Sequence, residues 1–368
     1  MERFQKESIP YLLKGLSIMG TGGGGEAEWG RILLENEFNK GREIYIVQPS
    51  EIEDDSFVCS GGIMGSVKSL GNVSFSDITA KWEKSFPLLD AVKLMEQLKG
   101  KKVDYLIPFE AGGLNTPVIM AVAARFGIPV IDADGNGRST PETQMNSFTG
   151  FGINLYPMPL VDSYGNKSVV MHSNLLTYAD EVGRLLIVKG GGLGANAHYP
   201  MSGKQVKRSL VPHTISKAIR IGKILENATN SEDDPINILS QFLNAKILFV
   251  GKIKEIQGID KGGFYLNNLL LTDKNEQHKA QLLIKNETMA LWVDNRLLIM
   301  LPDIIYMLDP SSGEGISTVN LKKGMDVVLL GANCHEKIQK TMLTEEGKLA
   351  FSPARYGYSK LEYFPFNL

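Results

Sequence analysis

Cysteine is scarce in this sequence, with two residues in a chain of 368, which excludes a disulfide framework. A charge excess of either sign is also missing. The formal net charge is −2, so the chain lacks the basic surplus that nucleic acid or an anionic membrane would attract. No run approaches the roughly 20 apolar residues that cross a bilayer, and the N-terminus lacks a signal peptide's apolar stretch and cleavage site. We therefore expect a cytoplasmic protein with neither nucleic acid nor membrane as a partner.

The composition is that of a folded globular protein. Hydrophobic residues make up 43% of the chain and charged residues 22%, which provides enough apolar surface for one or two packed cores. The two halves of the chain differ in pattern. Helix and strand signals alternate in the first half, whereas strand signals dominate the second. We expect an α/β domain over residues 1–170 and a mainly-β domain over residues 171–368.

The clearest local pattern in the first half is a strand–helix–strand unit. VDYLIPF (103–109) is a short apolar run with β-branched residues, as in a strand buried on both faces. PVIMAVAARF (117–126) follows as a helix that Gly127 ends, and IPVIDADG (128–135) is the next strand. This βαβ unit predicts two parallel strands joined by a right-handed crossover.

The second half contains one clear helix, which begins at Thr214, and then changes pattern. A polar, acidic stretch at 227–235 predicts a linker. Beyond it, short apolar runs alternate with turns, and no helical pattern of ten residues separates them. These runs are predicted to be strands: 245–256, 262–271, 280–287, 296–308 and 325–332.

Acidic side chains follow both strands of the βαβ unit. Glu110 comes just after the first strand, and Asp132 and Asp134 end the second. Parallel strands end at the same edge of a sheet, where open α/β sheets bind ligands, so these carboxylates are candidate catalytic residues. Their mutual repulsion calls for compensation by a divalent metal, a raised pKa or a cation such as Arg138. The alternative is structural, with Asp132 and Asp134 capping turns and Glu110 paired with Arg138.

Three glycine clusters interrupt the chain, at 20–25, 61–65 and 190–194. The first formally fits G-x-G-x-x-G, but a helix precedes it and no acidic residue ends the next strand, so a dinucleotide site is not predicted. The N–H groups of such a loop can contact a carboxylate or an oxyanion, which makes Gly22, Gly23 and Gly24 candidate substrate-binding residues. Tight turns that need a positive φ are the alternative. Cys59 opens the second cluster, CSGGIMG, which the glycines predict to be a turn; there it is either a nucleophile or a buried, inert thiol.

The five histidines form no local zinc motif such as H-E-x-x-H. His198 follows the third glycine cluster, and His213 precedes the helix that begins at Thr214. Either one is a candidate metal ligand beside Asp132 and Asp134, with His198 preferred, or an ordinary hydrogen-bonded residue.

Polar residues also end strands in the second half of the chain. Asn286 and Glu287 follow one predicted strand, and Asp303 interrupts another. These three residues either close the edge of the active site or are ordinary polar residues at turns.

Several sequence blocks resemble those of a known family. GTGGGG (20–25), FEAGGLN (109–115) and IPVIDADGNGRSTPETQM (128–145) resemble the N-terminal domain of the S-methyl thiohydantoin desulfurases, a hydantoinase-like family, and YPMSG (199–203) also fits. FVGKI, GGF, KNE, LPDII and RYGY resemble that family's second domain, so the resemblance covers nearly the whole chain. It implies a two-domain hydrolase of small heterocycles, with zinc as the metal. Asn115 and Glu142, which lie within these blocks, are candidate substrate-binding residues.

Three hypotheses about function follow. In the first, a metal held by Glu110, Asp132 and Asp134 activates a water that attacks the ring carbon of a hydantoin or thiohydantoin, with C–S or C–N cleavage. Arg138, as a catalytic residue, or the N–H groups of the glycine loop then stabilise the developing charge. In the second, Cys59 forms a covalent intermediate. In the third, the chain is a non-catalytic, ligand-binding subunit of a hydantoinase-type complex. A homo-oligomer is a further expectation.

Overall fold

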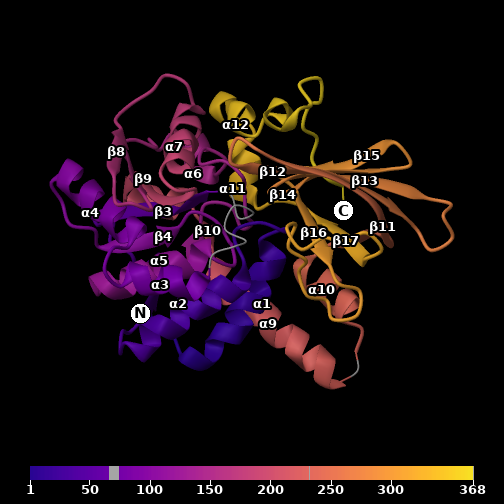
Figure 1. Ribbon diagram of the computed structural model, residues 1–368, viewed down its shortest axis with the longest axis horizontal. Coiled ribbons are helices and arrows are strands. Elements are labelled where there is room, and N and C mark those ends of the chain that lie inside the picture. Colours follow the sequence, from indigo (N-terminus) through magenta and orange to yellow (C-terminus); the bar gives the residue numbers. More distant parts are fainter. Residues whose placement is uncertain (66–73, 232, 368) are drawn as a thin grey trace.

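The computed structural model describes residues 1–65, 74–231 and 233–367. Two sheets lie side by side, as Figure 1 shows: a sheet surrounded by helices on the left and an antiparallel sheet on the right. Among the described residues, no helix combines the length and the apolar character that a membrane span requires. The expected combination of an α/β region and a mainly-β region is confirmed.

The first sheet has eight strands and mixed direction. Its order is β1-β2-β5-β4-β3-β9-β7-β8, with the adjacent strands β2, β5, β4 and β3 parallel and the remaining neighbours antiparallel. The parallel pair of β4 and β5, joined by α5 (Asn115–Phe126), is the predicted βαβ unit. The strands are β1 (Glu2–Arg3), β2 (Tyr45–Val47), β3 (Phe57–Gly65), β4 (Tyr105–Pro108), β5 (Val130–Ile131), β7 (Met158–Asp162), β8 (Lys167–Val170) and β9 (Leu193–Ser202).

Helices cover both faces of this sheet. One face packs on a core that includes α2 (Ala27–Asn39), α3 (Phe75–Trp82), α4 (Pro87–Lys99) and α5. The other face packs on α6 (Ser147–Gly150), α7 (Tyr178–Lys189) and α8 (Gly203–Ser209). Short 3-10 turns, η1 (Lys6–Ser8) and η2 (Pro49–Glu51), and a two-stranded ladder of β6 (Ala133–Asp134) with β10 (Val211–Pro212) complete this part. Layers of helix, sheet and helix are the usual way to bury both faces of parallel strands.

The second sheet is antiparallel throughout, in the order β15-β14-β13-β12-β11-β17-β16. Its alternating burial along β12 shows why the chain folds this way, since every second side chain enters the core. The strands are β11 (Lys246–Lys261), β12 (Phe264–Thr272), β13 (Lys279–Lys285), β14 (Glu287–Val293), β15 (Arg296–Met300), β16 (Ile304–Leu308) and β17 (Asp326–Ala332).

Helices pack between and beside the two sheets. α1 (Ile9–Met19) and α9 (Thr214–Ser231) cross so closely that a Cβ on Gly15 would lie 1.9 Å from the carbonyl oxygen of Ala218. The core on this side includes residues of both sheets, such as Leu106 of β4 and Leu330 of β17. The two parts of the molecule therefore share one buried seam.

Several local predictions were wrong. The stretch predicted as a linker is mostly helical, because α9 runs to Ser231 and α10 (Pro235–Leu243) begins at a cap formed by Asp234. The strand-only pattern missed α10, α11 (Glu336–Thr341), α12 (Glu345–Ala350) and the turn η4 (Pro353–Tyr356), and β14 was not recognised. The first sheet also extends past residue 170, because its inner strand β9 comes from later in the chain.

The glycine cluster at 61–65 is a strand rather than the predicted turn. It forms the end of β3, which pairs with β4 on one side and β9 on the other. Close approach explains the glycines: a Cβ on Gly61 would lie 2.6 Å from the carbonyl oxygen of Asn196. Glycine here makes room for a neighbouring strand.

Candidate functional site

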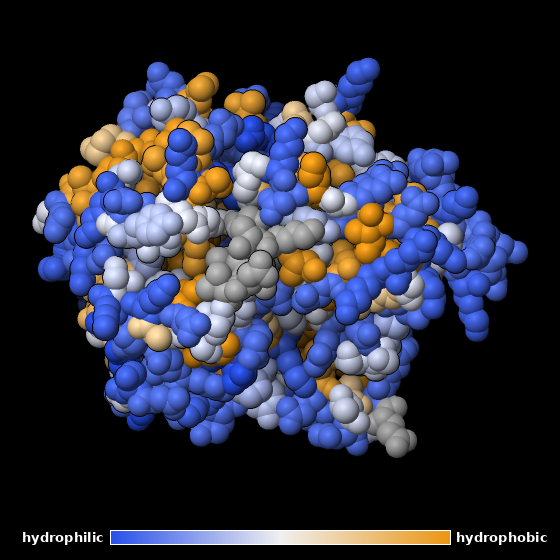
Figure 2. Space-filling view, in the orientation of Figure 1, coloured by the Kyte–Doolittle hydropathy of each residue, from blue (hydrophilic) through white to orange (hydrophobic). Residues whose placement is uncertain are grey.

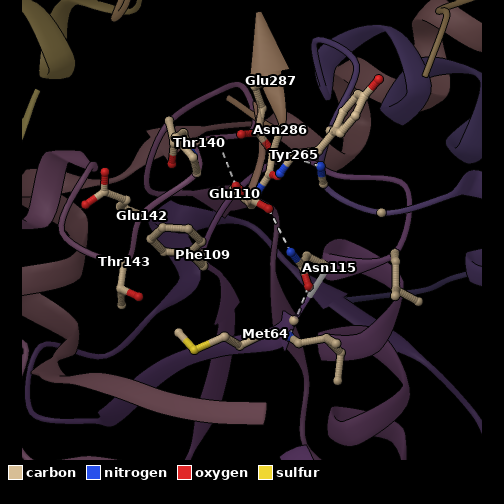
Figure 3. Close-up of a pocket in the computed structure, with 18 of the residues that line it drawn as sticks. Met64, Phe109, Glu110, Asn115, Thr140, Glu142, Thr143, Tyr265, Asn286 and Glu287 are labelled. Carbon is tan, nitrogen blue, oxygen red and sulfur yellow. Dashed lines mark hydrogen bonds between the residues drawn. The ribbon is translucent and has the colours of Figure 1, made fainter. Parts of the chain in front are cut away.

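A pocket opens at the carboxyl ends of β3 and β4, the edge at which open α/β sheets bind ligands. Its volume is about 110 Å³, which is in the range of cavities that hold one small ring. Segments from both halves of the chain line it: the glycine loop 22–25, the strand ends after Gly62 and Phe109, the loop at 140–143, and residues 286–287 and 317–319. Figure 3 shows Glu110 between Thr140 and Asn115, with Asn286 and Glu287 reaching in from another wall.

Glu110 is held at the end of β4 by two donors. The side-chain amide of Asn115 donates to Oε1 at 2.7 Å, and the backbone N–H of Thr140 donates to Oε2 at 2.7 Å. Asn115 is itself fixed, because its Oδ1 accepts a hydrogen bond from the N–H of Ile63 in β3. Both donors favour the charged form of Glu110, so this carboxyl group is held ready as a base.

Glu287 enters the pocket from the second sheet, where it begins β14. The preceding residue, Asn286, has a φ of +60° and is locked by hydrogen bonds to the backbone of Tyr265 in β12. Oε1 of Glu287 accepts from the N–H of Gly24 at 3.2 Å and from the hydroxyl of Ser139 at 3.0 Å. Its Oε2 is buried and has no hydrogen-bond partner among the described residues. That free oxygen is able to carry a proton.

The two glutamates differ in their expected protonation. Burial raises the pKa of both carboxyl groups, and the neighbouring charge of Glu110 helps to raise the pKa of Glu287 to about 8. Two buried carboxylates that share one pocket cannot both ionise easily, so the one whose two oxygens both accept hydrogen bonds carries the charge. Glu110 has a hydrogen-bond donor on each oxygen. Near neutral pH, Glu110 is therefore the charged member of the pair and Glu287 the protonated one.

The glycine loop connects these two carboxyl groups. Gly24 has a φ of +73°, and its carbonyl oxygen accepts hydrogen bonds from the N–H groups of Leu114 and Asn115 at the start of α5. A Cβ on Gly23 would lie 2.0 Å from Oε1 of Glu287, so only glycine leaves room for that carboxyl group. Gly22, Gly23 and Gly24, the candidate substrate-binding residues of this loop, all line the pocket.

A second charged network forms one wall of the pocket. Glu142, which lines it, is paired with the buried Lys285 and accepts hydrogen bonds from Arg355, including one of 2.5 Å to its Oε2. Beside it, Asp180 of α7 pairs with Arg184 at 2.8 Å. Glu142 is neutralised by two cations, so it is better suited to shaping the pocket than to exchanging protons.

His198 lies on β9 and also lines the pocket. It is buried, and its Nδ1 has no hydrogen-bond partner in the described part of the chain. Burial lowers the pKa of His198 to about 3, so its ring is neutral and can donate or accept a hydrogen bond without adding charge. Of the candidate metal ligands Asp132, Asp134, His198 and His213, His198 is the one that lines the pocket, where it joins Glu110.

Asp132 and Asp134 lie away from the pocket lining. Oδ1 of Asp132 accepts from the backbone N–H of Ser216 in the first turn of α9, and its Oδ2 accepts from the Ser216 hydroxyl. Oδ1 of Asp134 accepts from the N–H groups of Asn136 and Gly137. Asp132 therefore caps a helix and Asp134 caps a turn, as expected if the two aspartates have a structural role.

Arg138 also has a structural role. Its guanidinium is fully buried and donates to the carbonyl oxygens of Ser139, Thr288 and Asp303 and to the hydroxyl of Thr21. These partners, two of which belong to the second half of the chain, occupy the donors of the guanidinium. The ion pair between Arg138 and Glu110 that the sequence left open is therefore not found among the described residues. Arg138 ties the first half of the chain to the second.

The residues expected to hold a metal do not come together in this fold. Asp132 and Asp134 are engaged elsewhere, and across residues 1–65, 74–231 and 233–367 no three His, Cys, Asp or Glu side chains are grouped to hold a metal. Both oxygens of Glu110 already accept hydrogen bonds. The donor set therefore does not fit a metal ion, and no reaction step is derived through one.

Cys59 is buried in β3 and does not line the pocket. Burial raises the pKa of its thiol, which disfavours the reactive thiolate. The inert alternative fits this position, and the covalent hypothesis gains no support. His213 is exposed and has a φ of +60°; its ring meets Gln48 rather than the pocket.

Replacing Asp132 by Ala tests whether the residue acts in catalysis or only caps α9. We expect about 0.5–2 kcal/mol of stability to be lost, as for other helix caps, with turnover of the folded protein nearly unchanged. Thermal unfolding and an activity assay on the same preparation measure both quantities. Lost turnover at wild-type stability would return Asp132 to the chemistry.

Sequence reasoning missed several residues of the pocket. Asp180, Arg184 and Asn196 carried no motif, and their proximity arises only when β9 and α7 fold beside the loop at 140–143. Glu287 was considered as a residue at the site edge, without a role. Its position at a strand end, after Lys285 and Asn286, was the sequence signal for a place at the site. Asp303, which was considered for the same edge, instead accepts hydrogen bonds from the backbone N–H groups of Cys334 and Phe366.

Comparisons with known proteins bear on the family and the fold of the chain. The model of the S-Me-THD-like N-terminal domain matches residues 7–172, and that of the S-Me-THD-like C-terminal domain matches residues 173–366. No curated protein matches the chain. The X-ray structure of a protein from Chromobacterium violaceum matches with a TM-score of 0.80 and 21% identity, covering 100% of both chains, which shows a shared fold. The two domain models together span nearly the whole chain, which therefore belongs to the S-Me-THD-like family, the S-methyl thiohydantoin desulfurase-like family that its sequence blocks resemble.

Proposed function

We propose that this chain hydrolyses the exocyclic C–S bond of an S-alkyl thiohydantoin or a closely related small heterocycle. The observation that carries the proposal is the pair of Glu110 and Glu287, one charged and one protonated, at a cavity sized for a single ring. Family membership supports the thiohydantoin class of substrate.

The two carboxyl groups supply a balanced reaction. Glu110 takes a proton from a water molecule as the water oxygen bonds to the ring carbon that carries sulfur, while Glu287 gives its proton to the adjacent ring nitrogen. The C–S bond then breaks, the thiol leaves with the proton held by Glu110, and the hydroxyl proton returns to Glu287. The products are the hydantoin and a thiol, and both glutamates regain their starting state.

The charge of the pocket favours this bond over a ring C–N bond. Of the acidic residues that line the pocket, Glu142 and Asp180 are paired with cations and Glu287 is protonated. Glu26 and Glu110 remain as acids without an ion-pair partner among the described residues. Ring opening would create a new carboxylate among these acids, and like charges at short range repel. Cleavage of the C–S bond gives two neutral products, so the acidic lining supports desulfurisation.

The test is an assay with 5-substituted S-methyl thiohydantoins, in which released methanethiol and hydantoin are measured by mass spectrometry. We expect equal amounts of both, with oxygen from labelled water in the hydantoin and the ring intact. An N-carbamoyl product would overturn the choice of bond, and tight binding without turnover would favour the ligand-binding subunit instead. Elemental analysis of the same preparation, with turnover measured before and after chelation, tests the metal-assisted route directly.

A further inference from the structure

An exposed apolar surface covers α7 and the segment that leads into it. Seven of the fifteen large hydrophobic side chains that are exposed in the described part of the chain lie between residues 164 and 188. Figure 2 shows orange side chains gathered over this region, where Figure 1 draws α7 and β8. We call this set the α7 face: Tyr164, Met171, Leu175, Tyr178, Leu185, Leu186 and Val188. Such a concentration on one side of a globular fold marks an interaction surface.

The helix itself presents a stripe rather than scattered side chains. Tyr178, Leu185 and Val188 are 42%, 61% and 54% exposed and lie seven and three residues apart, so they share one side of α7. The opposite side of the same helix is buried against β3 and β9 through Ala179 and Ile187. α7 is therefore apolar on both sides, as helices are when a second surface covers them.

The charges on this stripe are self-complementary. Glu181 lies four residues before Leu185 and Lys189 lies four residues after it, and all three side chains are exposed. Oε1 of Glu181 also accepts a hydrogen bond from Arg355 of its own chain at 3.2 Å, which leaves Oε2 for a further partner. If two copies of α7 cross antiparallel about a two-fold axis at Leu185, Glu181 of each copy faces Lys189 of the other. An isologous contact requires this symmetry of apolar centre and opposite charges.

We propose that the α7 face is a two-fold interface between two copies of this chain. The stripe packs against its own copy with Leu185 at the axis, and the Glu181–Lys189 pairs close its two ends. The inner side of α7 carries Asp180 and Arg184, which line the pocket, so the partner covers the helix that forms one pocket wall. The inference does not depend on the reaction catalysed at that pocket.

Light scattering coupled to size exclusion tests the interface on the full-length chain. The wild type is expected at twice the monomer mass of 40.5 kDa, and Leu185→Glu at the monomer mass with an unchanged circular dichroism spectrum. Val188→Glu and Val250→Glu form a matched pair, because both valines are 54% exposed and only Val188 lies on the α7 face. Val188→Glu is expected to weaken the dimer and Val250→Glu to leave it intact.

A charge exchange makes the test specific to the antiparallel arrangement. Glu181→Lys alone and Lys189→Glu alone each place like charges opposite each other twice per dimer, which should weaken association roughly tenfold at low salt. Glu181→Lys also removes the ion pair with Arg355, so Glu181→Gln serves as its control for that loss within the chain. The double variant restores opposite charges and should regain the wild-type dissociation constant. A wild type that is monomeric at every concentration overturns the interface. A Leu185→Glu variant that still dimerises also overturns it. The same holds if the two single charge variants and the double variant have equal dissociation constants.

Discussion

Glu110→Gln is expected to lower kcat by about 10²- to 10⁴-fold, the range typical of a lost general base. The amide keeps the shape of the side chain and its contact with the N–H of Thr140, but it cannot accept a proton from water. Glu287→Gln should cause a loss of similar size, because the amide has no acidic proton to give to the ring nitrogen. Initial rates of thiol release over a range of substrate concentrations separate this kcat effect from any change in KM.

The pH dependence follows from the two protonation states. Glu287 must be protonated, and its pKa of about 8 means that activity is lost as the pH rises through this value. Glu110 must be charged, and burial raises its pKa above its usual range, so activity also falls toward acidic pH. The profile of kcat/KM should therefore be bell-shaped, and Glu287→Gln should abolish its alkaline limb together with most of the rate.

A matched control excludes a general effect of removing a buried carboxylate. Glu96 is buried outside the pocket, where it accepts from the N–H of Val103 and pairs with Lys102. Glu96→Gln should cost stability and leave kcat unchanged. If both site variants keep wild-type turnover and an unchanged pH profile while the protein still converts substrate, the carboxyl pair is not the catalytic centre.

Arg138→Met is expected to destabilise the fold by about 3–5 kcal/mol, as when one partner of a buried charged network is removed. The methionine fills part of the space but leaves the carbonyl oxygens of Ser139, Thr288 and Asp303 without their donor. Urea unfolding should show the loss as a lower midpoint. Arg138→Lys should recover part of it, since an ammonium group reaches fewer acceptors than the guanidinium.

The same variants discriminate between a structural and a catalytic role for Arg138. Its donors join the loop after β6 to both β14 and the residue before β16, so the seam between the two halves of the chain depends on it. A stable Arg138→Met protein without turnover would instead assign the guanidinium to the chemistry. We expect the folded fraction of the Lys variant to remain active.

Local patterns in the sequence were sufficient for the part of the site that one βαβ unit builds. The pattern placed Glu110 at the end of a strand, and it lines the pocket there, whereas Asn115 was singled out by the family resemblance and begins the helix that follows. Asp132 and Asp134 end strands at the same edge, yet their carboxyl groups satisfy nearby backbone N–H groups. Strand ends alone cannot distinguish a capping carboxylate from a catalytic one, because both occur at the same place.

Long-range contacts account for what the sequence did not predict. Glu287 reaches Glu110 only because β14 docks against a loop more than 260 residues earlier, at Gly24. The glycines at 61–65 looked like a turn because glycine serves both turns and close strand contacts, and only the neighbouring β9 decides between them. The short helices after β17 lack the length at which periodicity becomes visible.

The placement of the two glutamates on different sheets limits how this family can recombine. Each half of the chain has core residues of its own, so a chimaera that joins the first half of one member to the second half of another could still bury its apolar side chains. In such a chimaera, however, the carboxyl groups of Glu110 and Glu287 would lie at the wrong separation unless the residues on the two sides of the seam packed together as in the parent protein. Selection for turnover therefore acts on the seam as a unit, and compensating changes on its two sides should appear together in the family's descent.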